Sequence, residues 1–330
     1  MHLFDQPELA AQAVLTLMGH QPVAVRAAGR GGRNTVFEAT LSDGSRLAIR
    51  MGSPDSGPEF SSGLGWAQAL AARGVPAVVP IHVDADGHAC GLPCTIAPWS
   101  TGRDAEQVVA SLSVAQLATL GRTMASWSTS MLPMIHDYPA TGAGLLRFGS
   151  HQASHTNWLE YLRGNTEWRL GRALANPAWA APDDQDRLRA VGTLWSSLCP
   201  SVALAPMSLL AWDIGDRNVM LNAEGTPVAL VDVDELMVGD ALMAPALAWA
   251  ALAVQSLPLG HVTAWEEALP WTHDTNYKLR LLACKGYFLM NLSSKIGLQS
   301  ATGMAEVGSL TTARALIRDW MGSTRSALSQ

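Results

Sequence analysis

Lysine is scarce in this sequence of 330 residues: only three occur, Lys278, Lys285 and Lys295. Charged residues make up only 15% and the formal net charge is −6, so the chain lacks the basic surface that nucleic acids bind. Low charge combined with 48% apolar residues is typical of a compact globular protein with a large core. We therefore expect no nucleic-acid partner.

Cysteine is also scarce. The four cysteines, Cys90, Cys94, Cys199 and Cys284, form no Cys-x-x-Cys pair, which excludes the common patterns of zinc sites and disulfide frameworks. The sequence also lacks Gly-x-Ser-x-Gly, the nucleophile turn of many hydrolases. We interpret the cysteines as reduced and mostly buried, and covalent hydrolase chemistry finds no support.

A long uninterrupted apolar run is missing as well. The segment from Ala241 to Leu259 comes nearest, but it is alanine-rich and contains Pro245, Gln255 and Ser256, which indicates a buried helix. The N-terminus carries acidic residues where a secretory signal needs positive charge. These features predict a cytoplasmic protein with no membrane partner.

The first hundred residues show strand patterns separated by turns. Strands are predicted at 23–27, 35–40 and 46–51, with a hairpin turn at 42–45. A helix is expected at 62–73, and a turn at 84–87 leads into a strand over 91–99, where Pro93 and Pro98 suggest edge positions. The pattern predicts an antiparallel sheet, preceded by a leading helix at about 7–19.

Helical periodicity replaces this pattern from about residue 104. The candidate helices lie near 104–130, 156–172, 183–198, 241–256, 275–295 and 305–320. A strand-like island at 218–222 and 228–234, with a turn at 223–225, interrupts them. We predict an N-terminal lobe of residues 1–100 and a larger, mainly helical lobe of residues 101–330.

The island carries the residues for which we expect chemistry. Asp213 and Asn218 come at its start, and Asp232 and Asp234 end its second strand. Because adjacent antiparallel strands are about 5 Å apart, Asn218 and Asp232 can converge on one ion. Mg2+ prefers such oxygen ligands and bridges substrate phosphates, while a nearby carboxylate orients and deprotonates an attacking hydroxyl. We therefore predict Asp213 as catalytic base, Asn218 and Asp232 as Mg2+ ligands, and Asp234 as a further metal or supporting ligand.

The order Asp213-x4-Asn218, hairpin and Asp232 resembles the catalytic and metal loops of the aminoglycoside phosphotransferase and choline kinase superfamily. Gly239-Asp240 resembles the Gly-Asp that follows the metal loop in that family. The resemblance implies an α+β, bilobal protein-kinase-like fold, with an antiparallel β-sheet lobe holding one or two helices and a mainly helical lobe holding a catalytic β-hairpin. It also implies a kinase that uses ATP or GTP and Mg2+ to phosphorylate a small-molecule hydroxyl.

The same resemblance implies nucleotide-binding roles in the N-terminal lobe. The glycine-rich turn at 29–34 lies where such kinases cover the phosphates, and glycine permits close backbone approach. Arg50 stands where protein kinases have the phosphate-gripping lysine, and residues 96–99 stand in the hinge beside the base. The implied nucleotide-binding residues are Gly29, Gly31, Gly32, Arg33, Asn34, Ala48, Arg50, Ile96, Ala97, Trp99 and Met220.

The sequence departs from the family pattern in two places. Ala211 replaces a histidine that usually precedes the catalytic aspartate by two residues, and Trp212 stands where glycine is common. The helix that normally offers a glutamate to the phosphate-gripping residue has Gly63 and Gly65 near that place, with Glu59 about a turn earlier as candidate partner. A catalytically silent pseudokinase therefore remains an alternative.

The acceptor is less defined than the reaction. Residues 1–106 hold 10 acids and 7 bases and residues 107–330 hold 18 and 15, so each part carries −3 and neither favours a polycationic substrate. We expect an antibiotic-like hydroxyl compound, with choline-, homoserine- or sugar-like metabolites as the alternative. Trp158, Trp168 and Trp179 lie where the superfamily builds its acceptor pocket, and they either stack on a substrate ring or pack between helices.

Overall fold

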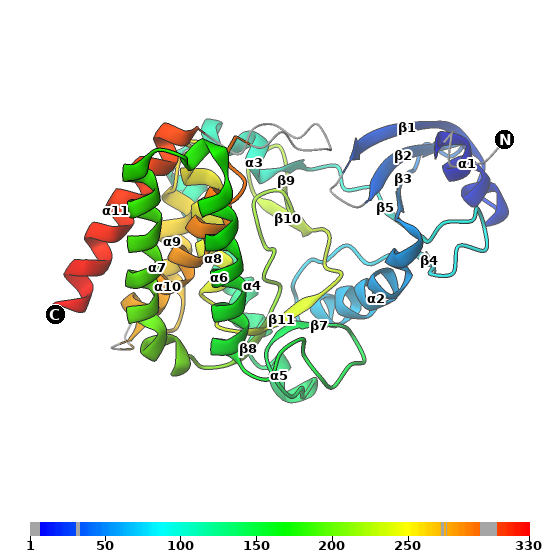
Figure 1. The fold of residues 1–330 in the computed structure, drawn as a ribbon. Coiled ribbons are helices and arrows are strands. Elements are labelled where there is room, and N and C mark those ends of the chain that lie inside the picture. Colours follow the sequence, from blue (N-terminus) through cyan, green and yellow to red (C-terminus); the bar gives the residue numbers. More distant parts are fainter. Residues whose placement is uncertain (1–6, 31–33, 272–273, 275, 298–308) are drawn as a thin grey trace. The chain divides into compact units, whose positions relative to one another are not determined.

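The structure is a computed structural model, and it describes residues 7–30, 34–271, 274, 276–297 and 309–330. The described chain forms two compact units (Figure 1). The first contains the described residues up to Gly102, together with Arg147–Gly149 and Ala229–Glu235. The second contains Arg103–Leu146, Ser150–Val228 and the described residues from Leu236 onward. Two later segments of the sequence thus complete the first unit.

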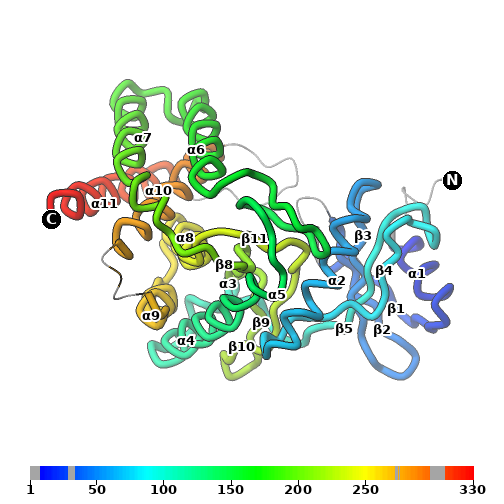
Figure 2. Tube along the Cα trace, turned by 90° about the horizontal axis from the view of Figure 1, so that it is seen from below, coloured from blue at the N-terminus to red at the C-terminus, as the bar shows by residue number. Residues whose placement is uncertain are grey.

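The first unit is built on a five-stranded sheet (Figure 2). Its strands, in the order β1-β2-β3-β5-β4, are β1 Pro22–Arg30, β2 Thr35–Leu41, β3 Arg46–Met51, β5 Cys94–Pro98 and β4 His82–Asp84. All four pairings are antiparallel, which confirms the predicted sheet. The sequence predicted that the strand now seen as β5 lies at an edge of the sheet. This prediction is wrong, because β5 lies between β3 and β4. Pro93 and Pro98 fall outside the segment Cys94–Ile96 that pairs on both sides, so neither removes a shared hydrogen bond.

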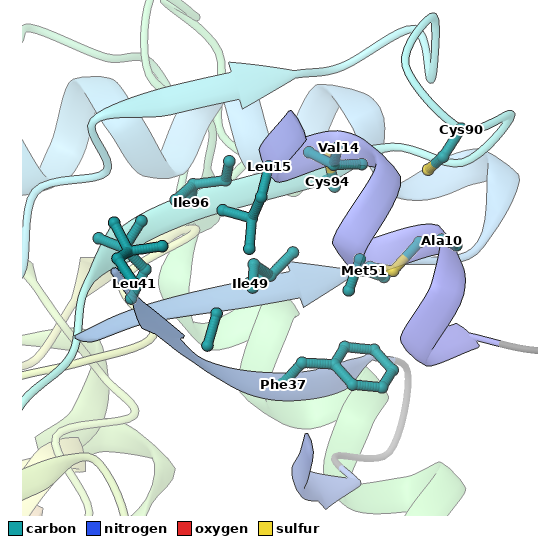
Figure 3. Packing of buried hydrophobic residues seen from close by; sticks show 13 residues of the cluster. Ala10, Val14, Leu15, Phe37, Leu41, Ile49, Met51, Cys90, Cys94 and Ile96 are labelled. Carbon is teal, nitrogen blue, oxygen red and sulfur yellow. The ribbon is translucent and has the colours of Figure 1, made fainter. Parts of the chain in front are cut away.

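The two faces of this sheet differ. Ile49 and Met51 of β3 point into a core that helix α1, Pro7–Leu17, covers (Figure 3). Leu47 of the same strand belongs to this core as well. Because side chains alternate along a strand, Ala48 and Arg50 lie on the opposite face. The sheet therefore presents Arg50 away from the α1 core.

Helix α2, Gly57–Ala71, follows the short 3-10 helix η2, Pro54–Ser56. Together with the residues after it, α2 holds the two later segments of the first unit. The Phe148 ring packs edge-on against Trp66 at 5.0 Å, and the Phe148 N–H donates to Ser62 Oγ at 2.9 Å. A Cβ at Gly65 would lie 2.2 Å from the Phe148 ring, so this contact requires glycine. The other segment is attached at Leu230, whose N–H donates to Pro76 O at 2.9 Å.

The second unit is mainly helical. Its helices are α3 Ala105–Val108, η3 Val109–Ser111, α4 Val114–Met131, α5 Met134–Asp137, α6 Trp158–Ala175, η4 Pro177–Trp179, α7 Pro182–Ala203, α8 Met243–Ala253, α9 Gly260–Ala268, α10 Tyr277–Ser293 and α11 Leu310–Leu328. Helix α10 packs against α6, α7, α8 and α11. The predicted helix at 104–130 is in fact broken, because Ser113 and Gln116 form a capping box that starts α4.

Two small sheets complete the strand inventory. One has the order β10-β9-β6, with β10 Pro227–Leu230, β9 Val219–Leu221 and β6 Arg103–Asp104. The other has the order β7-β11-β8, with β7 Gly144–Leu146, β11 Leu236–Gly239 and β8 Ser208–Leu210. The predicted island is confirmed as β9 and β10, whereas β7, β8, β11 and α9 were not predicted because each is short.

The alanine-rich run forms α8, and most of its residues are buried, as predicted. Within the described residues, each helix is too short or too polar to cross a membrane.

Candidate functional site

In the first unit, Arg50 brings together two of the predicted metal-binding residues. Its Nη1 and Nη2 atoms lie 2.8 and 2.6 Å from the two carboxylate oxygens of Asp234. Nη2 also lies 2.8 Å from Asp232 Oδ1. The side chains of Arg50 and Asp234 are 20% and 19% exposed, whereas that of Asp232 is 46% exposed. Bidentate pairing of this kind fixes the guanidinium plane.

The charges around Arg50 do not balance. Burial works to lower the pKa of Arg50, but Asp232, Asp234 and Glu59 act against it and the pKa is raised. Burial raises the pKa of Asp234 to about 6, and the neighbouring Asp232 and Glu59 add to that rise while Arg50 opposes it. Three carboxylates thus share one guanidinium, and the site carries excess negative charge.

The local backbone explains how these groups meet. A Cβ at Gly63 of α2 would lie 2.7 Å from Asp234 Oδ1 and 3.3 Å from Asp234 Cα, so glycine leaves room for Asp234. Asp232 has φ 61°, a left-handed conformation that aspartate tolerates better than most residues and that concentrates at functional sites. In the sequence, Gly63 was noted only as a departure from the family pattern. It is the signal that a neighbouring group, Asp234, approaches α2 here.

Glu59 was the expected partner of Arg50. Asp234 is a bidentate partner of Arg50 that the sequence did not reveal, and Glu59 also acts on Arg50 electrostatically.

The predicted nucleotide residues of the first unit lie on several parts of the sheet. Ala48 pairs with Ala97 and shares a sheet face with Arg50. Gly29 pairs with Val36, and Asn34 directly precedes β2. The predicted Gly31, Gly32 and Arg33 lie outside the described residues.

The residues predicted to form the hinge, 96–99, are held by backbone hydrogen bonds of the sheet. The Ile96 side chain belongs to the α1 core, and its carbonyl accepts from the Ile81 N–H at 2.8 Å. The Trp99 N–H donates to Arg46 O at 3.0 Å. The nucleotide-binding role of residues 96–99 stays a prediction.

The sequence did not single out one buried acid on the Ala48 face. Glu38 lies opposite Ala48 and is only 6% exposed. It accepts from Arg26 Nη2 at 2.6 Å and from Arg46 Nη1 at 2.7 Å, and the hydrogen bond from Arg26 is the largest cause lowering its pKa, with Arg46 assisting. The alternation of β2, with Phe37 and Ala39 in the core, was the available signal.

In the second unit, Asp213 and Asn218 lie on one loop between β8 and β9. Asp213 is exposed, and Asn218 donates from Nδ2 to the Asp213 carbonyl at 2.8 Å. Because the amide nitrogen makes this bond, the side-chain oxygen is the atom of Asn218 that can serve as a ligand. Met220 follows on β9, opposite Asp104.

This loop is anchored by residues that the sequence did not reveal. His261 of α9 is fully buried, and its Nε2 lies 2.8 Å from Asp216 Oδ1. Glu106 donates its N–H to Asp216 O at 3.1 Å, and its carboxylate pairs with Arg217. Gln255 adds a 2.7 Å hydrogen bond to Glu106. The loop is thus held directly from α3 and α9, and Gln255 in the turn after α8 supports Glu106.

The loop is also held at Ala211, the position where the sequence resemblance implied a histidine. Ala211 is buried, and its N–H donates to Met131 Sδ at 3.4 Å.

Among the residues that the structure describes, no group of three or more His, Cys, Asp or Glu side chains could hold a metal ion by itself. Mg2+ commonly binds through one or two carboxylates and completes its shell with water and substrate phosphates. The exposed carboxylate of Asp232 and the excess negative charge around Arg50 fit such an ion. When bound, it would neutralise charge on the transferred phosphate.

Comparison with known proteins identifies the family. The model of the phosphotransferase enzyme family matches residues 24–271. The chain belongs to this family. The phosphotransferase is accordingly a small-molecule kinase, and the resemblance found in the sequence is confirmed. No curated protein sequence matches it.

Solved structures show the fold of the phosphotransferase. An apo thermostable mutant of aminoglycoside phosphotransferase APH(4)-Ia has TM-score 0.66 and 13% identity, over 96% of this chain and 98% of that chain. The GDP and kanamycin complex of APH(2″)-IIIa has TM-score 0.61 and 14% identity, over 97% and 96%. A Ralstonia eutropha jmp134 protein described as a putative aminoglycoside phosphotransferase has TM-score 0.63 and 15% identity, over 98% of both chains. The predicted kinase-like α+β fold is confirmed.

Proposed function

We propose that this phosphotransferase transfers the γ-phosphate of ATP or GTP to a hydroxyl group of a small molecule, with Asp213 as the catalytic base. The observation that carries the proposal is the exposed Asp213 carboxylate on a loop fixed by Asn218 and by the buried Asp216–His261 pair. A general base must be accessible to the acceptor and held in one position. Asp213 meets both conditions.

The nucleotide-side roles follow from the charges. Arg50 grips the phosphates, and Asp232 and Asn218 bind Mg2+, with Asp234 supporting Arg50. Structures of similar fold were determined with ADP and hygromycin B, with AMP-PNP and hygromycin B, and with GDP and kanamycin, which supports a nucleoside triphosphate as co-substrate. The residues implied on the sheet, including Ala48, Ala97 and Asn34, line the nucleotide in this proposal.

The acceptor in the leading proposal is an antibiotic, because the structural neighbours bind hygromycin B and kanamycin. A metabolic alcohol is the second candidate. Positive charge near Asp213 favours this second candidate. Lys295 interacts electrostatically with Asp213 and also with Arg169 and Arg172. Positive charge at the acceptor side disfavours a polycationic drug.

Phosphate transfer from ATP and GTP to a panel of antibiotics and small alcohols tests the proposal directly. We expect Mg2+-dependent transfer to at least one acceptor, and a loss of about 100-fold or more in Asp213→Asn, since a positioned base contributes at least that much. Nucleotide binding should be unchanged in this variant. Asp186→Asn, on the exposed face of α7, is the matched control and should retain full activity. Full activity of Asp213→Asn would refute the assignment, and absence of transfer above nucleotide hydrolysis would support a pseudokinase.

A further inference from the structure

Three cations of the second unit form a group that we call the cationic cluster: Arg169 and Arg172 on α6, and Lys295 in the turn that follows α10. The end of α10 is fastened to the end of α6. Asn176 Nδ2 donates to Ile296 O at 2.8 Å, and Trp179 Nε1 donates to Ser293 O at 2.8 Å. These bonds hold the backbone on both sides of Lys295 next to the end of α6.

Arg169 is the unusual member of the cluster. Its Nε and Nη1 atoms are buried, yet they meet no hydrogen-bond acceptor in the described part of the chain. The guanidinium instead lies over the Tyr287 ring, 4.1 Å from its centre. A buried charged donor without an acceptor is costly, and natural structures keep few of them without a reason. An oxygen-bearing ligand would satisfy these donors.

The electrostatics connect the cluster with the catalytic loop. Partial burial and the charges of Arg169 and Arg172 lower the pKa of Lys295, whereas Asp213 acts in the opposite direction. Lys295 is therefore within electrostatic range of both arginines and of the proposed base. The positive charges of Arg169, Arg172 and Lys295 outnumber the one carboxylate, that of Asp213. This region therefore carries excess positive charge.

We propose that the cationic cluster binds an anionic group of the acceptor, a carboxylate or a phosphate, and so places the acceptor hydroxyl at Asp213. This inference rests on the proposed function of Asp213. Guanidinium groups suit such anions, because their planar donors match two oxygens at once. A polycationic aminoglycoside would be repelled by the same charges.

Trp168 adds an apolar surface to the site. It is 57% exposed, whereas Trp158 and Trp179 are buried at 4% and 0%. Its ring lies 4.9 Å from the Arg172 guanidinium carbon. Of the three tryptophans that the sequence suggested for substrate stacking, Trp168 is the one whose surface a substrate can reach.

A binding experiment separates the site from the chemistry. The Tm is measured with D-gluconate, inorganic phosphate or uncharged D-glucose, always with AMP-PNP or GMP-PNP and Mg2+ present so that all three nucleotide phosphate positions are filled. We expect a saturable rise with at least one anion and none with glucose. The rise should be lost in the double variant Arg169→Gln/Lys295→Gln, which we call the cluster variant. It should be kept in the control Arg189→Gln/Lys278→Gln, which also removes one arginine and one lysine, both from exposed positions. No rise in the wild type, or an equal rise in the cluster variant, would overturn the proposal.

A kinetic experiment assigns the anion to the acceptor. Matched acceptors with and without a carboxylate, such as glycerate and glycerol or gluconate and glucose, are compared for phosphate transfer. In the cluster variant, the KM of the anionic acceptor should rise about tenfold or more, and the KM of the nucleotide should be unchanged. The reason is that one charge-assisted hydrogen bond changes binding affinity by about tenfold. A rise in the nucleotide KM alone would show that the cluster binds nucleotide phosphate, against the proposal. Lys295→Gln alone, at an exposed position, should show part of the effect without a folding defect.

The two proposals fail in different ways. If the wild type transfers no phosphate but binds anions through the cluster, the proposed function fails and the anion site stands. If transfer depends on Asp213 but the cluster variant is fully active on anionic acceptors, the anion site fails and the proposed function stands.

Discussion

Two arginines show how differently the two units treat a partly buried guanidinium. Arg50 in the first unit has carboxylate oxygens at 2.6 to 2.8 Å from both terminal nitrogens, whereas Arg169 in the second unit has two buried nitrogens without an acceptor among the described residues. The charge around them has opposite sign, with three carboxylates acting on Arg50 and Lys295 as a cationic neighbour of Arg169. Carboxylates of the protein hold Arg50 in place, while the Arg169 guanidinium lies over the Tyr287 ring.

The difference indicates what each place binds. Excess negative charge around Arg50 favours a divalent cation with its phosphates, and excess positive charge around Arg169 favours an anion. Pairing with Asp234 and Asp232 positions the Arg50 guanidinium before a ligand binds, whereas two buried nitrogens of Arg169 are left for a ligand to satisfy. Variants that compare paired with unpaired groups test this contrast.

The largest expected effect concerns a fully paired guanidinium in the same unit as Arg169. Arg280 is buried, and it pairs with Asp240 at 2.8 Å and with Asp274. Arg280→Met should lower the free energy of unfolding by about 3–5 kcal/mol, because it leaves the buried Asp240 carboxylate without its cationic partner. Arg169→Met should change it by less than about 1 kcal/mol, because the charge removed has no carboxylate partner. Urea unfolding measures both, and equal losses would contradict the contrast.

The Asp234→Asn substitution tests the Arg50 site itself. We expect about 1–2 kcal/mol lower stability, a modest value because both side chains are partly exposed and Asp232 still contacts Arg50. The KM of the nucleotide should rise as well, because Arg50 loses its bidentate support. Urea unfolding and steady-state kinetics are the measurements, with the exposed Asp186→Asn as the control. Unchanged stability and unchanged nucleotide KM would show that Asp234 does not position Arg50.

Much of the fold could be predicted, because its signals are local. The alternation of β3 and the turns around it gave the sheet, and the Asp213–Asn218 spacing with Asp232 gave the loop that the structure shows anchored. The partner of Arg50 was harder, since Asp234 lies 184 residues later in the sequence. Such a contact depends on which segments return to the first unit, and no local pattern encodes that return.

The same limit applies to the second unit. The Asp216–His261 pair and the joining of α6 to the end of α10 both connect distant segments through packing. Scattered histidines and arginines carry no periodic signal, so they remained unassigned. Helix α9 was missed for a simpler reason, because it spans only Gly260–Ala268 and a periodic pattern needs a longer segment.

The smallest expected effect concerns the space that glycine gives to Asp234. Gly63→Ala places a Cβ 2.7 Å from Asp234 Oδ1, so the carboxylate must shift and loosen its contact with Arg50. Gly164→Ala on α6 meets nothing within 4 Å and serves as the matched control. The control should gain about 0.5–1 kcal/mol, as alanine does in a helix, whereas Gly63→Ala should lose about 1 kcal/mol and raise the nucleotide KM. If Gly63→Ala were as stable as the Gly164→Ala control, the space beside Asp234 would be large enough for a Cβ. The contact of Asp234 with Arg50 would then not depend on glycine at this position of α2.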